Sequence, residues 1–255
     1  IYSRQSFLKE GKHIFWGGLT LASKNEGVGL FNQELSAFLS LGGKIFYESP
    51  VTDLLVKDNV VKGIYIGNKK IESDAVILAS GGFEKNQELR EQYLPQPTNA
   101  DWSAANVHNT GDALNEGLRL DAATHQMDTG WWSTTMKVPG QDKGWLSMVD
   151  KSMPGNYTVN KNGERFSNES QNYVSFVNDM FEEYAKGNPC APCYMIFDSD
   201  FRKNRPCGPL LQASMQPDSR VPKEWWDPSF LIKADTLEEL AEKVGLNADG
   251  LLKTQ

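Results

Sequence analysis

An arginine, a glutamate and a tyrosine lie within nine residues of one another in the middle of the chain, at Arg165, Glu169 and Tyr173. An apolar strand precedes them, and Asn162-Gly163 predicts the tight turn of a β-hairpin. The returning arm carries the guanidinium and the carboxylate, and it leads into a helix whose first turn holds the phenol. A rigid hairpin can present such groups to a ligand in a pocket. The alternative is a surface hairpin in which Arg165 and Glu169 only pair with each other.

A second segment with the composition of a ligand site runs from Asp74 to Phe83 and reads DAVILASGGF. Its continuous apolar run predicts a short strand that is buried on both faces, as in a sheet covered by helices. Gly81 and Gly82 follow at the carboxyl end, where open α/β sheets bind ligands, and they leave room for a phosphate or a ribose. Shorter strands precede this one and predict a β-meander, over residues 44–48, 51–57, 60–66 and 69–72.

Helices are predicted for much of the remaining chain. The sequence favours them over residues 30–41, 87–93 and 111–120. Residues 206–228 are rich in proline and predict an irregular surface segment. Asp235 or Thr236, with Glu238 or Glu239 three residues further on, predicts a capping box that opens an amphipathic helix.

Composition restricts the classes of partner. The 255 residues are enough for one large domain or two, and the formal net charge of -7 argues against binding to a nucleic-acid backbone. No apolar run approaches the length of a transmembrane helix. Cys190, Cys193 and Cys207 form no disulfide framework, and Cys190-Ala-Pro-Cys193 lies in a predicted loop, without the βαβ context of a redox motif. The three histidines are scattered along the chain, so no metal site is predicted.

The motifs, taken in order, resemble those of the flavoproteins of the fumarate reductase and 3-ketosteroid dehydrogenase superfamily. The matching stretches are Ser49–Leu54, Val61–Ile64, Ala75–Phe83, Asn109–Leu114, Met127-Asp128 before Trp131-Trp132, Pro154-Gly155 before Val159-Asn160, Gly163–Phe166 with Asn168–Ser170 and Tyr173, and Lys233–Ala241. Within this superfamily the chain is most similar to the 3-ketosteroid Δ1-dehydrogenase branch.

The resemblance implies a chain of α/β and α+β class. Residues 1–130 are expected to form the later part of a Rossmann-like FAD-binding domain with an inserted β-meander, and residues 131–255 part of a substrate-binding cap domain. The G-x-G-x-x-G turn that opens such flavoproteins has no counterpart here, because Gly27-Val28-Gly29 lacks the third glycine. We therefore expect the chain to be the central part of a longer protein.

FAD is the cofactor that the resemblance implies. The implied cofactor-binding residues are Val51, Ala79, Ser80, Gly81, Gly82, Asn109, Thr110, Gly111 and Asp112. For Asp112 the alternative role is electrostatic stabilisation of the amino end of its helix.

Steroid Δ1-dehydrogenation transfers a hydride to flavin N5 and removes a proton from the adjacent carbon, so the enzyme must supply a base and hydrogen-bond donors. The resemblance places the base on Tyr173. A free phenol has a pKa of about 10, so we expect Arg165 or another nearby donor to favour its ionised form. The alternatives are that Tyr173 packs in the core and that Arg165 and Glu169 only brace the hairpin.

The turn before Tyr173 separates two branches of the superfamily. Fumarate reductases generally carry an arginine in this turn, since a dicarboxylate needs cations, whereas here it reads Ser170-Gln171-Asn172. Aromatic residues nearby favour an apolar, ring-shaped ketone as the substrate. They are Trp131, Trp132, Tyr157, Phe166 and Phe176.

The leading interpretation is a cytoplasmic flavin-dependent dehydrogenase, with peripheral membrane contact left open, that acts on a steroid-like ketone and passes electrons to an external acceptor. Two alternatives remain. The first is a relative that acts on a dicarboxylate or another activated alkene. The second is a fragment that binds a ligand or partner but catalyses nothing by itself, and for the isolated chain we expect this second behaviour.

Overall fold

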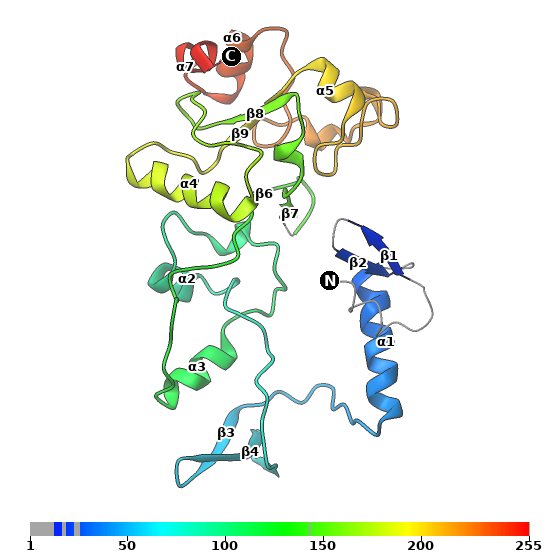
Figure 1. Cartoon of the computed structure of the whole chain (residues 1–255), viewed down its shortest axis with the longest axis vertical. Coiled ribbons are helices and arrows are strands. Elements are labelled where there is room, and N and C mark those ends of the chain that lie inside the picture. Colours follow the sequence, from blue (N-terminus) through cyan, green and yellow to red (C-terminus); the bar gives the residue numbers. More distant parts are fainter. Residues whose placement is uncertain (1–12, 17–18, 23–25, 143, 255) are drawn as a thin grey trace. The chain divides into compact units, whose positions relative to one another are not determined.

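The computed structural model describes residues 13–16, 19–22, 26–142 and 144–254. The chain divides into two compact units, Ile1–Val76 and Ile77–Gln255. Helices and sheets occur together, as predicted, and each of the four sheets within the described residues is antiparallel (Figure 1).

The first unit contains a hairpin, a long helix and a three-stranded sheet. In the hairpin, β1 (His13–Trp16) pairs with β2 (Leu19–Ala22), and α1 (Glu26–Ser40) follows. The sheet has the order β3-β4-β5 and consists of Asp53–Lys57, Val60–Ile66 and Lys69–Glu72. The β3–β4 turn places Asp58 and Asn59 at φ of 53° and 59°, a conformation that these two residue types tolerate. This part of the predicted meander is therefore confirmed.

Two predicted strands are wrong. Residues 44–48 and 75–83 contain no strand, and apolar side chains that were expected to be buried are exposed, with Ile77 at 89%. An extended apolar segment becomes a strand only where a neighbour pairs with its backbone. No strand in the described part of the chain pairs with either segment, so their side chains remain uncovered.

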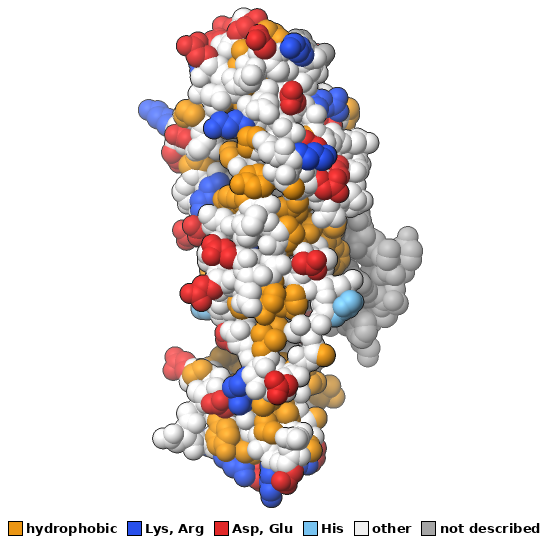
Figure 2. All heavy atoms as spheres, turned by 90° about the vertical axis from the view of Figure 1, so that its left-hand side faces the viewer, with side chains coloured by type: hydrophobic (Ala, Val, Ile, Leu, Met, Phe, Trp, Pro, Cys, Tyr) orange, Lys and Arg blue, Asp and Glu red, His pale blue; other side chains and the backbone are white. Residues whose placement is uncertain are grey.

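The first helix also differs from its prediction. It begins at Glu26, before the expected start at residue 30, so Gly27 and Gly29 lie in its first turn. Exposed hydrophobic side chains are visible among charged ones on the face of the protein shown in Figure 2.

The second unit is mainly helical and holds two short sheets. Its helices are α2 (Gln87–Tyr93), α3 (Asp112–Arg119), α4 (Tyr173–Ala185), α5 (Ser199–Asn204), α6 (Leu237–Val244) and α7 (Ala248–Thr254). Its 3-10 helices are η2 (Ala100–Trp102), η3 (Asp150–Ser152), η4 (Asp218–Arg220) and η5 (Lys223–Trp225). Its strands pair as β6 (Thr135–Met136) with β7 (Trp145–Leu146) and β8 (Asn156–Val159) with β9 (Tyr194–Phe197). The predicted helices over residues 87–93 and 111–120 are confirmed, and residues 206–228 contain only short helical turns.

A buried cluster joins β8 and β9 to α6 and α7. Its members are Val159, Ile196, Ala241, Leu246 and Leu251. The cluster anchors the strand that leads toward the predicted hairpin turn.

The amino end of α6 confirms the predicted capping box. The hydroxyl of Thr236 accepts a hydrogen bond from the backbone of Glu239 at 3.2 Å, and the Glu239 carboxylate accepts one from the backbone of Asp235 at 2.9 Å. Gly245 then ends the helix with a φ of 72°.

Candidate functional site

The turn at Asn162-Gly163 is fixed by the side chain of Asn160. The Oδ1 atom of Asn160 accepts hydrogen bonds from the backbone of Asn162 at 2.9 Å and of Glu164 at 3.1 Å. Gly163 has a φ of 76°, and the backbone of α7 occupies the space where a side chain would stand. The turn is confirmed, but the returning arm is not a strand. It touches β8 through one isolated bridge at Arg165, and β8 takes β9 as its partner.

Arg165 and Glu169 form a two-bonded pair behind this turn. Nε of Arg165 lies 3.1 Å from Oε1 of Glu169, and Nη2 lies 2.6 Å from Oε2. The carboxylate also accepts a hydrogen bond from the backbone of Thr158 at 2.8 Å. The Glu169 side chain is buried, whereas 49% of the Arg165 side chain is exposed. The pair therefore ties the loop before α4 to β8.

The charges of this pair act on each other and on Tyr157. Burial opposes the ionisation of Glu169, but hydrogen bonds from Arg165 and Thr158, with the charge of Arg165, hold the pKa of Glu169 below its usual value. The hydrogen bond to Glu169 raises the pKa of Arg165. Burial raises the pKa of Tyr157, and the charge of Arg165 offsets only part of this effect. The geometry is that of the bracing alternative, and a direct role for Arg165 at Tyr173 remains a prediction.

Tyr173 is the first residue of α4. The helix is capped by Asn172, whose Oδ1 accepts a hydrogen bond from the backbone of Ser175 at 2.9 Å. The phenol oxygen of Tyr173 receives a hydrogen bond from Nε1 of Trp131 at 2.8 Å. Trp131 is 84% exposed and lines a cavity, whereas Tyr173 is partly buried and reaches that lining through this hydrogen bond.

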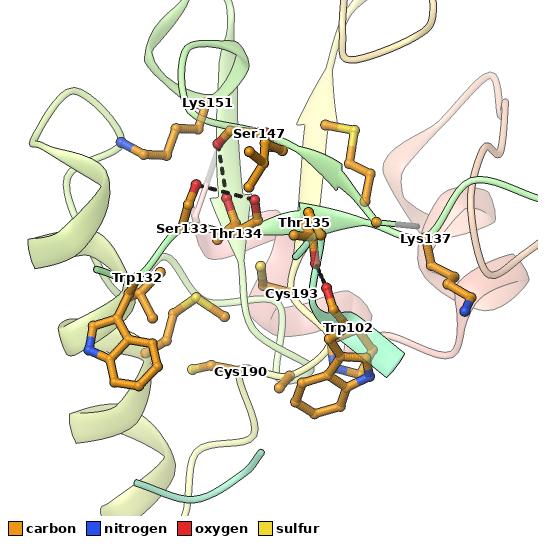
Figure 3. Close-up of a pocket in the computed structure, with 18 of the residues that line it drawn as sticks. Trp102, Trp132, Ser133, Thr134, Thr135, Lys137, Ser147, Lys151, Cys190 and Cys193 are labelled. Carbon is orange, nitrogen blue, oxygen red and sulfur yellow. Dashed lines mark hydrogen bonds between the residues drawn. The ribbon is translucent and has the colours of Figure 1, made fainter. Parts of the chain in front are cut away.

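The cavity lies within the second unit and has a volume of about 1200 Å³. This exceeds the range of roughly 300–1,000 Å³ that is usual for small-molecule sites. Its lining is predominantly apolar, and aromatic side chains supply much of it. Figure 3 shows Trp102 and Trp132 on two sides, with Cys190 and Cys193 between them. Trp132 is held in place by an edge-to-face contact with Phe181, at 5.3 Å between ring centroids.

A small number of polar groups interrupt this apolar lining. The hydroxyl of Thr134 donates a hydrogen bond to the carbonyl of Ser147 at 3.0 Å, and the hydroxyl of Thr135 donates one to the carbonyl of Trp102 at 2.7 Å (Figure 3). The first bond lies at the end of the β6–β7 sheet, and the second joins β6 to η2. Both bonds fix the wall of the cavity.

Lys151 is a cavity residue that the sequence did not indicate. It lies in η3 and is only 2% exposed. Its Nζ donates hydrogen bonds to the carbonyls of Glu169 at 2.8 Å and of Gln171 at 2.7 Å. Burial lowers the pKa of Lys151, and the charge of Glu169 offsets part of this shift. Its partners are 18 and 20 residues away along the chain, so no local motif could have revealed the contact.

Most of the predicted cofactor residues meet in the second unit. The backbone N–H of Gly111 donates a hydrogen bond to the carbonyl of Gly82 at 3.0 Å. Gly81, at a φ of 87°, packs so tightly against the side chain of Asn109 that a Cβ would collide with it. The hydroxyl of Thr110 bonds to the Asp112 carboxylate at 2.8 Å, at the start of α3. The two glycines and the residues 109–112 thus form one cluster of turns.

The other predicted cofactor residues lie outside this cluster. Ala79 and Ser80 precede it on an exposed segment without regular structure. Val51 belongs to the first unit, where it is exposed and precedes β3. Their contribution to a cofactor site remains a prediction.

The three cysteines carry free thiols. Burial raises the pKa of Cys190 to about 11, and it raises the pKa values of Cys193 and Cys207 to about 12. The thiols are therefore protonated at neutral pH, which makes them weak nucleophiles and weak metal ligands. Within the described ranges, His, Cys, Asp and Glu side chains form no group of three or more that could hold a metal ion.

Comparison with known families decides the ancestry. The sequence matches the profile of the FAD binding domain over residues 19–254. The chain belongs to this FAD-binding family. FAD is the family's cofactor, as the sequence motifs predicted.

Several curated relatives of this FAD-binding chain are steroid dehydrogenases. The 3-oxosteroid 1-dehydrogenase of Mycolicibacterium smegmatis is 34% identical over 97% of this chain and 45% of its own length. The enzyme of the same name from Mycobacterium tuberculosis is 36% identical over 80% of this chain and 37% of its own length. A probable fumarate reductase of Shewanella frigidimarina is 26% identical over 81% of this chain. The chain thus spans less than half the length of the steroid dehydrogenases that it matches.

One of the similar solved structures is also a steroid dehydrogenase. The 3-ketosteroid delta1-dehydrogenase of Sterolibacterium denitrificans, in complex with 1,4-androstadiene-3,17-dione, superposes with a TM-score of 0.78 and 36% identity, over 86% of this chain and 40% of that one. The open form of a flavocytochrome c3 fumarate reductase has a TM-score of 0.61 and 23% identity, which shows a likeness of fold alone.

The cluster of turns in the FAD-binding chain is the candidate site for a dinucleotide. A glycine stretch can admit close approach by a phosphate or a ribose, and Ser80 before the two glycines is exposed. In this structure the side chains of Asn109 and Glu84 occupy the positions where Cβ atoms of Gly81 and Gly82 would stand. Binding of the cofactor by these residues remains a prediction.

None of the helices in the described ranges is long and apolar enough to cross a lipid bilayer.

Proposed function

We propose that this FAD-binding chain belongs to a dehydrogenase that introduces a C=C bond next to the ketone of a steroid-like substrate. One observation carries the proposal: the phenol oxygen of Tyr173 bonds to Trp131, which lines a roomy, mainly apolar cavity. A base beside an apolar cavity suits removal of a proton from a carbon that a ketone has acidified.

The residues divide the chemistry between them. FAD, where bound, would supply the hydride acceptor. Tyr173, as the phenolate, takes the proton from the adjacent carbon and becomes the neutral phenol. The indole N–H of Trp131 donates to that same oxygen at 2.8 Å, and a donor of this kind stabilises a phenolate relative to a phenol. Trp131 is thus the nearby donor that assists Tyr173, and the electrons leave through an external acceptor.

The two sets of site residues have separate duties in this proposal. Gly81, Gly82 and residues 109–112 hold the cofactor through backbone and short polar side chains. Residues 131–255 contribute the substrate side, as part of a cap domain, and residues 1–130 the cofactor side. Trp132 offers a flat, rigid surface against which fused rings can pack, and Trp102, from the cofactor side, lines the same cavity.

A dicarboxylate substrate is less well supported. A dianion needs cationic side chains with free donors. The loop between Glu169 and Tyr173 has no cation, and the ammonium of Lys151 already donates to two carbonyls there, so the remaining cations of the cavity, Arg90 and Lys137, lie outside this loop. The relatives that are steroid dehydrogenases support the same preference.

The substrate class can be tested by anaerobic mixing of the flavin-loaded whole protein, of which this chain is a part, with 3-ketosteroids and, after chemical reduction, with fumarate. We expect a 3-ketosteroid to bleach the oxidised flavin and fumarate to leave the reduced flavin unchanged. Re-oxidation by fumarate, with no bleaching by any 3-ketosteroid, would overturn the proposal.

A further inference from the structure

Lys151 is a charged side chain in a position where charge is costly. It is 2% exposed, and its ammonium lies 4.9 Å from the centre of the Phe176 ring in the first turn of α4. Figure 3 shows it among the residues that line the cavity. Lysine is almost never fully buried without partners, so its partners indicate what it does.

All three donors of the ammonium are engaged. Two go to the carbonyls of Glu169 and Gln171, at 2.8 and 2.7 Å, and the third is directed at the hydroxyl of Ser152 at 3.4 Å. An ammonium has three donors and no acceptor. Lys151 therefore has no strong donor left for a substrate, and it does not act as a catalytic acid.

The bonds from Lys151 hold one particular loop. The neighbouring Ser152 also bonds to this loop, because its hydroxyl donates a hydrogen bond to the carbonyl of Glu169 at 2.9 Å. At the other end of the loop, the side chain of Gln171 donates to Asp179 of α4 at 2.6 Å. The two residues after Gln171 are the helix cap and Tyr173.

We propose that Lys151 is a positioning residue, which sets the place of the Tyr173 phenol at the cavity by clamping the backbone of residues 169–171. The inference rests on the proposed role of Tyr173 as the base. The clamp and the Trp131 hydrogen bond fix the phenol from opposite ends, one through the backbone and one at the oxygen. Lys151 thus acts on the reaction without touching the substrate.

The test measures the rate of anaerobic flavin bleaching by a 3-ketosteroid in the flavin-loaded whole protein, of which this chain is a part. Lys151→Met keeps the length of the side chain and removes the donors. We expect it to lower the rate by about 10–100-fold, since small misplacement of a reacting group has effects of this size. Lys186→Met is the matched control, because Lys186 is an exposed lysine at the end of α4 whose ammonium donates to Glu183. It should leave the rate unchanged.

Introducing Lys151→Met into the Tyr173→Phe variant distinguishes positioning of the phenol from a purely structural role. If the clamp acts through the phenol, Lys151→Met has almost no further effect on the residual rate in that background. Hydrogen exchange should also increase in residues 167–176 and remain unchanged in β8 and β9. Ser152→Ala, a milder change to the same clamp, should show the same dependence on Tyr173 if Lys151→Met fails to fold.

The outcomes distinguish the inference from the function on which it rests. A normal rate in Lys151→Met and Ser152→Ala, or equal losses with and without the phenol, would overturn the clamp while Tyr173→Phe remains inactive. A near-normal rate in Tyr173→Phe itself would overturn both the base and the clamp.

Discussion

The loop that presents Tyr173 and the segment that ends in Gly81-Gly82 are held in different ways. The loop is fixed by side chains, since Arg165, Lys151 and the backbone of Thr158 all bond to its residue Glu169. The glycine segment has fewer anchors among the described residues: the hydroxyl of Ser73 donates to the carbonyl of Ala75 at 3.0 Å, and the carbonyl of Gly82 accepts the backbone N–H of Gly111. The residues that precede it are exposed.

This difference shows which parts of the site are self-sufficient. A loop that is pinned by its own polar side chains keeps its shape without a sheet around it. An apolar segment needs neighbouring strands before it can become regular. We therefore expect changes near Tyr173 to affect catalysis and stability, and changes near Gly111 to affect the binding of FAD.

The largest effect should follow from removing the phenol oxygen. Tyr173→Phe should lower turnover of a 3-ketosteroid by about 10²–10⁴-fold, the usual contribution of a general base. The flavin content, read from the absorbance of the purified holoprotein, should not change, because the glycine cluster is intact. Tyr65→Phe in β4 is the control and should be fully active. Loss of flavin from Tyr173→Phe would show that the two regions are not separate.

The ion pair between Arg165 and Glu169, behind the turn, gives the next largest effect. Arg165→Ala leaves the buried Glu169 carboxylate without its cation, which should lower the free energy of unfolding by about 2–3 kcal/mol after allowance for the exposed half of the arginine. Arg119→Ala removes a pair on α3 whose carboxylate, Glu116, is 18% exposed compared with 7% for Glu169, and it should cost less.

Chemical denaturation of the two variants, with the double variant Arg165→Ala/Glu169→Gln, measures this brace. The double variant should recover part of the loss, because no buried charge is left unpaired. Equal stability of Arg165→Ala and the parent protein would show that the pair does not hold the loop.

Gly111→Ala should act on the other region. The added Cβ would collide with the side chain of Leu89 and stand 3.1 Å from Cβ of Phe83, at a φ of 90°. Gly245→Ala is the matched control, because its φ is also positive, at 72°, while its surroundings are open. Both changes should cost about 1 kcal/mol of backbone strain, but only Gly111→Ala should weaken the binding of FAD in a titration of apoprotein. Equal flavin affinity of the two variants would contradict a cofactor role for this turn.

The smallest effect is a pH dependence of stability. The pKa of Glu169 is lower in the folded protein than its usual value, so its stabilising contribution is complete above that usual value. The contribution is lost as the pH falls through the lower, folded pKa. As the pH is lowered, the free energy of unfolding should therefore fall less steeply for Glu169→Gln than for the parent protein. Parallel curves would show that Glu169 does not ionise at an unusual pKa.

The sequence predicted best what is decided by neighbouring residues. The turn at Asn162-Gly163 and the cap at Thr236 depend on bonds that span only a few residues, and both are confirmed. The family motifs also placed residues 81–82 and 109–112 in one site, and the structure brings them together.

What the sequence missed depends on residues far apart in the chain. It predicted that the returning arm at Arg165 pairs with β8, whereas the partner of β8 is β9, later in the chain. The bond from Trp131 to Tyr173 spans 42 residues. The strands expected over residues 44–48 and 75–83 failed because an apolar pattern does not specify whether a neighbouring strand exists.

The central claim is that Tyr173 removes a proton from the carbon next to the ketone, and isotope exchange measures that step alone. The holoprotein is chemically reduced under anaerobic conditions, so that hydride transfer cannot occur, and is incubated with a saturated 3-ketosteroid in D₂O. Mass spectrometry then follows deuterium entry beside the ketone. The account predicts steady incorporation with the parent protein and loss of at least about 100-fold in rate with Tyr173→Phe. Equal incorporation by both proteins would contradict it.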